Sequence, residues 1–332
     1  MKQISSLLLL SAMLLANTSS SAQHRFQVKQ SFPVYSMGGW DYIAVGPDGN
    51  LYASNRSQVN ILNKKTGDSV GVITNTIGVH GIAFVTNLGR GYISDGGADN
   101  VTVFDIKTHK ELAKIATGKD PDAIFYEPYS KKIVTCNGHS DNLSIIDPAT
   151  DKVVATIAVG GKPETAVSDG KGMIYVNLED KSEIAAVNIK NNTVVSHWSL
   201  APADGPTGLA FDKETKRLFS GCDNVLVVLD ATNGKVVARL PIGAGCDGVA
   251  FDNRSKEVFT ANGVGTLTVI KERHANDFVV QENVPTQRSA RTIAIDESTR
   301  TLYLPAAEFE SKIENGKRRQ VKPDTFKILV VK

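Results

Sequence analysis

The sequence predicts an all-β fold, a seven-bladed β-propeller with four antiparallel strands in each blade. Three observations carry this prediction. A sequence motif returns about every 40 residues, each unit contains four strand-like runs, and the two ends of the chain supply complementary parts of one blade. The composition agrees, because 41% hydrophobic residues in a chain of 332 are enough for a large core, and 28 glycines suit a fold rich in turns.

The repeat is plainest in two segments that lie 42 residues apart: residues 99–122 and 141–164 are identical at ten of 24 positions. Along the whole chain the first apolar core residue of the motif occurs seven times, with spacings of 39, 42, 42, 43, 40 and 44 residues, at Ile43, Ile82, Ile124, Ala166, Leu209, Val249 and Ile293. A period of 40–45 residues is typical of propeller blades.

Each unit contains short runs of β-forming residues bounded by Gly, Asn and Asp. In the sixth unit these runs are GVAFD, KEVFTAN, GTLTVIKE and DFVVQENV. No unit shows the 3.6-residue period of an amphipathic helix. Each unit is therefore expected to form one four-stranded antiparallel sheet.

The ends of the chain predict closure of the ring. The seventh unit supplies only three runs, RTIAID, TLYLPAA and TFKILVVK, whereas residues 26–34, FQVKQSFPV, form a run without a unit of its own. The N-terminal strand can complete the last blade, which removes an open sheet edge that would invite aggregation. We therefore expect residues 23–332 to form a single propeller domain.

Residues 1–22 have the layout of a cleaved secretory signal peptide. A basic Lys2 precedes an apolar run at residues 7–15, and small residues Ser20 and Ala22 follow. The run is too short to span a bilayer. We expect a periplasmic or secreted monomer without a membrane span. A net charge of +2 gives no bulk attraction to nucleic acid, which argues against that class of partner.

The turns and strand ends resemble those of a known family. Residues 121–137, PDAIFYEPYSKKIVTCN, follow the pattern P-D-G-V-A-V-x-P-D-G-x-x-L-Y-V-T-N, and YVTN-like strand ends appear as YASN, YISD, VTCN, YVNL, FSGC and FTAN. The mature chain resembles the YVTN-repeat, or YncE-like, seven-bladed propellers of bacterial envelopes. The resemblance implies the fold and supplies no catalytic residue.

One ring of side chains is expected at the mouth of the central channel, which the first strand of each blade lines. This inner ring lies two positions before each first core residue and consists of Asp41, His80, Asp122, Glu164, Thr207, Asp247 and Arg291. Its carboxylates have two interpretations. They cap turns by accepting backbone N–H groups, or Asp122, Glu164 and Asp247 hold a Ca²⁺ or Mg²⁺ ion.

Further candidate binding residues lie on the same face. His80 and His139 depart from the repeat average and are candidates for ligand contact or proton transfer. Arg288 and Arg291, with a basic insertion at residues 308–324, can hold a carboxylate or phosphate, or the insertion is a solvated loop. Trp40 either stacks on a ring or sugar or packs between blades seven and one.

The three cysteines have no metal-binding spacing. In an exported protein Cys222 and Cys246, which belong to neighbouring loops, can form a disulfide, and Cys136 is expected to be unpaired.

GAGCDG, residues 243–248, matches a dinucleotide-binding pattern, but a strand follows it where such a site needs a helix.

Three functions compete on this basis. The first is an exported binding or scaffold propeller, which presents a polar face to a small ligand or a periplasmic protein and does no chemistry. The second is a metal-dependent, lactonase-like hydrolase with a divalent cation at the channel mouth. The third is an accessory subunit in electron transfer, which the resemblance implies because related propellers resemble parts of amine dehydrogenases and cytochrome reductases. Since the chain has no C-x-x-C-H haem motif, it would have to dock a redox partner.

Overall fold

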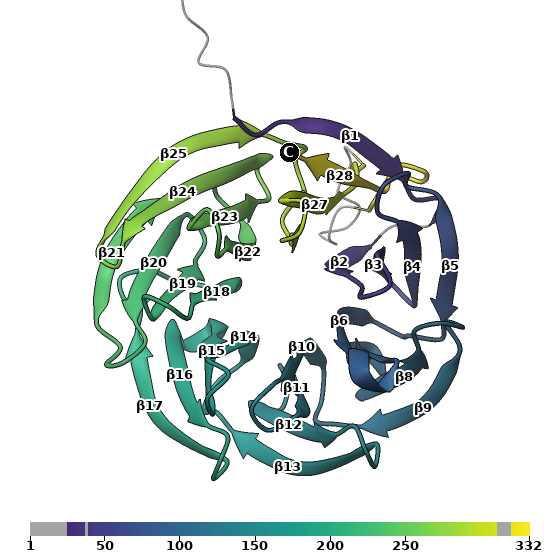
Figure 1. The fold of residues 1–332 in the computed structure, drawn as a ribbon, viewed down its shortest axis with the longest axis horizontal. Helices are drawn as coiled ribbons and strands as arrows, with labels where there is room; N and C mark the ends of the chain where they lie inside the picture. Colours follow the sequence, from purple (N-terminus) through teal and green to yellow (C-terminus); the bar gives the residue numbers. More distant parts are fainter. Residues whose placement is uncertain (1–24, 37–38, 311–319) are drawn as a thin grey trace, which may run out of the picture.

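The structure is a computed structural model that describes residues 25–36, 39–310 and 320–332. Seven four-stranded antiparallel sheets stand as blades around a central axis, which confirms the predicted propeller (Figure 1). The predicted signal peptide, residues 1–22, lies outside the described residues. Within the described ranges, no helix has the length and apolar character needed to cross a membrane.

The first three blades each run from the axis outward in chain order. Blade one contains β2 (Trp40–Val45), β3 (Asn50–Asn55), β4 (Gln58–Asn63) and β5 (Ser69–Thr74). Blade two contains β6 (Val79–Val85), β7 (Arg90–Asp95), β8 (Asn100–Asp105) and β9 (Glu111–Ala116), with short 3₁₀ turns η1 (Thr86–Leu88) and η2 (Gly96–Ala98). Blade three contains β10 (Pro121–Glu127), β11 (Lys132–Asn137), β12 (Asn142–Asp147) and β13 (Lys152–Ala158).

Blades four to six repeat the same order. Blade four contains β14 (Pro163–Ser168), β15 (Met173–Leu178), η3 (Glu179–Lys181), β16 (Glu183–Asn188) and β17 (Thr193–Ser199). Blade five contains β18 (Leu209–Asp212), β19 (Arg217–Gly221), β20 (Val225–Asp230) and β21 (Val236–Pro241). Blade six contains β22 (Cys246–Asp252), β23 (Glu257–Asn262), β24 (Thr266–His274) and β25 (Asp277–Pro285).

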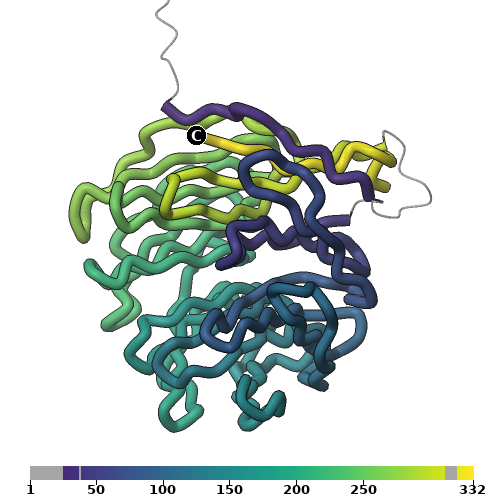
Figure 2. The backbone as a smooth tube through the Cα atoms, turned by 45° about the vertical axis from the view of Figure 1, so that its right-hand side comes forward, coloured from purple at the N-terminus to yellow at the C-terminus, as the bar shows by residue number. Residues whose placement is uncertain are grey.

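Blade seven joins the two ends of the chain. Its order is β26 (Ala294–Asp296), β27 (Thr301–Ala306), β28 (Lys327–Val331) and then β1 (Val28–Pro33) on the outside. Figure 2 shows the purple N-terminal segment beside the yellow C-terminal one. The expected ring closure is therefore confirmed. The first strand of this blade is shorter than the predicted run, which began at Arg291.

The hydrophobic core lies between neighbouring blades. At the closing junction Phe32 and Ile328 of blade seven pack in one cluster with Trp40 and Leu51 of blade one. Second and third strands are buried on both faces, as in β3 and β4, because each is sandwiched between two neighbouring sheets. The outermost strands alternate between exposed and buried residues, as β17 does. This packing fixes the positions of the first strands around the axis.

Candidate functional site

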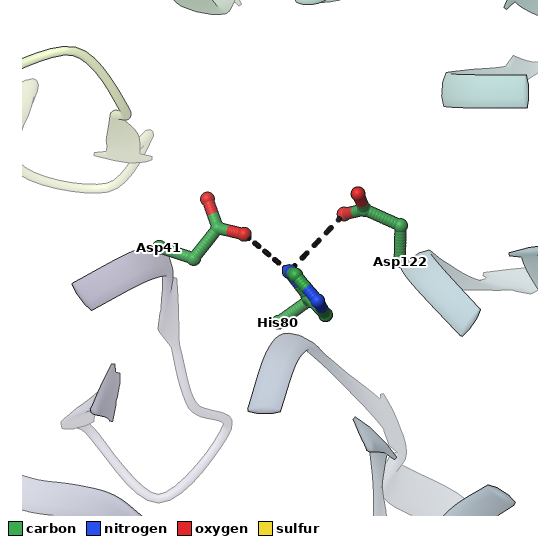
Figure 3. A group of neighbouring side chains, drawn as sticks. All are labelled: Asp41, His80 and Asp122. Atoms are coloured by element: carbon green, nitrogen blue, oxygen red, sulfur yellow. Dashed lines mark hydrogen bonds and ion pairs between the residues drawn. The ribbon is translucent and has the colours of Figure 1, made fainter. Parts of the chain in front are cut away.

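The inner ring residues of the first three blades lie where the first strand breaks its register with the second. The register shifts fall between Trp40 and Ile43, between Val79 and Ile82, and between Pro121 and Ile124. A register shift of this kind is a β-bulge: it inserts an extra residue into one strand and changes the direction in which a side chain points. In Figure 3, Asp41, His80 and Asp122 all point toward one another from these three strand starts.

Buried serines of the second strands satisfy the backbone at two of these irregular positions. Ser54 Oγ accepts the Asp41 N–H at 3.0 Å and donates to the Tyr42 carbonyl at 2.9 Å. Ser94 Oγ accepts the Gly81 N–H at 2.8 Å. These serines stand in the strand ends YASN and YISD, so the sequence did carry a signal for them. Their hydrogen bonds fix the backbone of the inner ring to the second strands.

His80 is the centre of the charged group at the mouth. Its Nδ1 lies 2.5 Å from Asp41 Oδ2 and 3.7 Å from Asp122 Oδ1, and its Nε2 lies 3.7 Å from Asp120 Oδ1. Burial alone would lower the pKa of His80. The hydrogen bond to Asp41 and the charges of the surrounding carboxylates outweigh burial and raise the pKa to about 9. At neutral pH His80 is therefore a cation between carboxylates.

The remaining ring carboxylates have cations of their own. Lys162 Nζ lies 2.7 Å from Glu164 Oε1 and also contacts Glu179. Arg291 lies 3.2 Å from Asp247 Oδ2 and 3.9 Å from Asp41 Oδ1. Glu164 and Asp247 thus each form an ion pair with a nearby cation.

Burial dominates the titration of these carboxyl groups. It raises the pKa of Glu164 to about 8, with a further rise from the charge of Asp122. It raises the pKa of Asp122 to about 7, where the charge of Asp41 adds to the rise and His80 opposes it. For Asp247 burial raises the pKa to about 6 against the opposing charge of Arg291. These three carboxyl groups therefore change protonation closer to neutral pH than ordinary carboxyl groups do.

Tyr42 crosses the channel beneath the ring. Its Oη lies 3.4 Å from Thr165 Oγ1, which belongs to β14 of blade four. A side chain from the first strand of blade one reaches blade four only across the axis. Burial, together with the ring carboxylates, raises the pKa of Tyr42 well above its usual range. The tyrosine thus stays neutral and helps to close the channel below the mouth.

A cavity of about 1100 Å³ opens at the channel mouth; we call it the mouth cavity. Five inner ring members line it: Asp41, His80, Thr207, Asp247 and Arg291. Other ionisable side chains in its wall are Arg56, Glu179, Asp223 and Arg288. The cavity wall is therefore charged with both signs, and its residues come from six of the seven blades.

The other predicted candidates divide between cavity and surface. Trp40 is 7% exposed and stacks on Phe326 at 5.8 Å between ring centroids, so it packs between blades seven and one while lining the cavity. Arg288 also lines the cavity. His139 is 70% exposed, contacts Asp120 at 3.3 Å and is not among the lining residues. Residues 311–319 of the basic insertion lie outside the described part of the chain.

Turn capping on this face is carried out by other aspartates. Asp99, Asp180 and Asp223 accept the backbone N–H groups of Asp120, Lys162 and Gly245 at 2.9, 2.7 and 3.2 Å. All three aspartates belong to loops between second and third strands. Among the described residues, the inner ring carboxylates instead contact side chains, namely those of His80, Lys162 and Arg291.

The expected disulfide between Cys222 and Cys246 is not formed, and all three cysteines are free and buried. A Cβ atom added to Gly221 would lie 2.7 Å from Cys246 Sγ, so Cys246 packs against that face of the strand. Successive side chains along a strand point to opposite faces. Cys222 therefore points the other way, into the core of blade five.

Comparisons with known proteins agree with this architecture. A family model described as YncE-like β-propeller matches residues 79–163. No curated protein sequence matches the chain. Hydrazine synthase from Kuenenia stuttgartiensis superimposes with a TM-score of 0.73 at 16% identity, over 82% of this chain and 94% of that one.

Two further solved structures share the fold. The WD40 repeats of RRP9 give a TM-score of 0.77 at 9% identity, over 91% of this chain and 97% of that one. A chain of a mitotic checkpoint complex gives 0.74 at 11% identity, over 91% and 96%. At such identities the likeness concerns the fold alone. The matched residues 79–163 comprise β6 to β13. The chain is thus a seven-bladed β-propeller whose second and third blades match the YncE-like family.

Proposed function

We propose that this protein is an exported binding propeller that holds a small anionic molecule in the mouth cavity. The observation that carries the proposal is a cavity of about 1100 Å³ into which ionisable side chains converge from several blades. Typical ligand sites are concave, of about 300–1000 Å³, with a few polar groups that fix orientation. The mouth cavity is slightly larger than the upper limit of that range.

The polar groups of the cavity favour an anion on the side of blades seven and one. Arg288 lines the cavity and forms no ion pair with any described residue. The neighbouring Trp40 Nε1 is a buried donor without an acceptor in the described part of the chain. Arginine pairs with a carboxylate or phosphate through two parallel hydrogen bonds. A carboxylate or phosphate in the cavity would therefore give Arg288 an anionic partner.

Carboxylates in the cavity wall favour hydroxyl or amino groups on the same ligand. Asp247 and Glu179 line the cavity with carboxylate oxygens that accept hydrogen bonds. The ligand class that fits both the arginine and the carboxylates is a small hydroxylated or amino-bearing acid. Export is a prediction from residues 1–22 of the sequence alone. A periplasmic protein partner, a lactonase-like activity and a redox partner also stay predictions.

Intrinsic fluorescence offers a direct test, because the chain has only two tryptophans and one of them, Trp40, lines the cavity. A Trp198→Phe protein isolates the signal of Trp40. Citrate and inorganic phosphate are titrated, with glucose as a neutral comparison. We expect a saturable change with an anion, weakened at least tenfold by Arg288→Ala.

Arg273→Ala is the matched control, because Arg273 is an exposed arginine in blade six outside the cavity. It should leave the affinity unchanged. The proposal fails if no anion gives a saturable change in fluorescence or in melting temperature. It also fails if Arg288→Ala and Arg273→Ala weaken binding equally, since that result indicates nonspecific attraction to surface charge.

A further inference from the structure

The geometry points to a binding site for one divalent transition-metal ion, represented by zinc, formed by Asp41, His80 and Asp122. One potential ligand atom from each residue lies within 4.8 Å of the other two (Figure 3). Ligands at about 2.0–2.2 Å from a tetrahedral zinc ion are about 3.3 Å apart. Small movements of the side chains therefore bring the three atoms to bonding distance.

An unsatisfied oxygen is the second observation. Asp122 Oδ1 is buried and accepts no hydrogen bond from any described residue; its nearest cationic neighbour is His80 Nδ1 at 3.7 Å. A buried acceptor without a donor destabilises the fold. The oxygen points to the same place as Asp41 and His80, so a metal ion there would satisfy it.

The far side of the imidazole is arranged as at known metal sites. His80 Nε2 faces Asp120 Oδ1 at 3.7 Å, on the side away from the ligand group. Metal-binding histidines commonly donate their second N–H to a carboxylate, which fixes the ring and raises its basicity. The backbone N–H of Asp120 is bonded to Asp99 at 2.9 Å, which anchors this carboxylate. Asp120 is therefore a positioning residue.

The charges around the inner ring favour this ligand set over the one expected from the sequence, which contained Glu164 and Asp247. Glu164 is paired with Lys162 and Asp247 with Arg291. Asp41 and Asp122 share His80, with one further contact of 3.9 Å from Arg291 to Asp41. Metal binding releases the proton of His80 Nδ1 to solvent, and the divalent ion with the neutral imidazole then balances two carboxylates.

The ligand types also select the metal. An imidazole nitrogen suits zinc and its neighbours in the first transition row, whereas Ca²⁺ and Mg²⁺ prefer all-oxygen sites. Asp41 and His80 line the mouth cavity, so the remaining coordination position faces that space. The inference does not rest on anion binding at Arg288, and either proposal can fail without the other.

The experiment uses the purified chain without a polyhistidine tag. The protein is freed of metal with a chelator and titrated with Zn²⁺ against a chromophoric competitor, and Co²⁺ supplies a visible spectrum of the site. We expect one ion per chain and much weaker binding of Ca²⁺ and Mg²⁺. His80→Gln and Asp41→Asn should each weaken zinc binding at least a hundredfold, and Asp120→Asn by about 10–100-fold.

Glu164→Gln and Asp247→Asn are the matched controls, because both carboxylates belong to the inner ring but not to the proposed ligand set. They should leave zinc affinity within about threefold, and melting curves establish that each variant is folded. Absence of stoichiometric zinc binding by the unmodified chain overturns the inference. So does zinc binding that survives His80→Gln or Asp41→Asn but is lost in Glu164→Gln and Asp247→Asn.

Discussion

His80 Nδ1 lies 2.5 Å from Asp41 Oδ2, so blades one and two are joined at the channel mouth by a hydrogen bond between charged groups. The two residues occupy the same position of the repeat, 39 residues apart in the chain. The bond also places the only inner ring histidine against carboxylates of blades one and three. The protonation of His80 therefore affects both the stability of the ring and the properties of the mouth cavity.

The stability of the protein should fall between about pH 6.5 and pH 9. The pKa of His80 is about 9 in the fold against an ordinary 6.5, so its stabilisation is complete below pH 6.5 and is lost as the pH rises through 9. The pKa values of Asp122 and Glu164 are raised to about 7 and about 8, and they contribute with the same sign. Melting temperatures at pH 6, 7.5 and 9 measure this loss.

Two variants distinguish His80 from general effects of pH. His80→Gln should flatten the dependence between pH 6.5 and 9. His274→Gln, which removes an exposed histidine in blade six, should leave it unchanged. Equal slopes in all three proteins would show that His80 is not the group responsible.

The closing junction should depend on Phe32. This residue of β1 is 3% exposed and packs against Gly67 in the turn after β4, so closely that a Cβ atom at Gly67 would lie 2.3 Å from its ring. Phe32→Ala should reduce the free energy of unfolding by about 3–5 kcal/mol, because it leaves a cavity between blades seven and one. Tyr35→Ala is the control, since Tyr35 is 85% exposed and should change stability by less than about 0.5 kcal/mol. Urea unfolding of both variants measures the difference, and similar midpoints would contradict the role of Phe32.

Arg300 should stabilise the junction between blades six and seven. Its guanidinium group lies 2.8 Å from Asp252 and 2.8 Å from Glu257, and both carboxylates are buried. Arg300→Ala leaves two buried charges without this partner, and we expect a loss of about 2 kcal/mol. Arg254→Ala, an exposed arginine in the same turn as Asp252, should cost far less. Chemical denaturation of the pair tests the prediction, which is wrong if the two losses are equal.

The cysteine thiols should be inert in the folded protein. All three are free and buried, and burial raises the pKa of Cys222 to about 11 and the pKa of Cys136 well above its usual range. A thiol reagent should therefore label none of them in native protein and all three after denaturation. If only one thiol is labelled after denaturation without reductant, Cys222 and Cys246 are joined by a disulfide and the prediction of three free thiols is wrong.

The fold could be predicted from the sequence because a propeller repeats its pattern in every blade. The spacing of the core residues from Ile43 to Ile293 fixed the number of blades, and the unpaired run at residues 26–34 indicated closure. The start of the last blade was predicted less well. Arg291 precedes β26 because the chain there follows a hydrogen-bonded turn through Ala290 and not the ladder.

The residues of the inner ring could also be predicted from the sequence, but their ion pairs and hydrogen bonds could not. Repeat position places Asp41, His80 and Asp122 on one circle without giving its radius, so the distance between neighbours is unknown. Lys162, which neutralises Glu164, lies one residue outside the first strand and was not singled out. The close approach between the backbones of neighbouring blades could not be predicted from the sequence either. Gly248 stands beside the ring because a Cβ atom there would lie 2.9 Å from the backbone nitrogen of Ile293.

The pairing of β1 with β28 has a consequence for the timing of assembly. Among the described strands β1 is the first in the sequence and its partner β28 is the last, so the ring cannot lock before β28 has been synthesised. The same arrangement makes completeness a condition of stability, because a nascent chain that stops short of β28 exposes strand edges and is open to proteolysis.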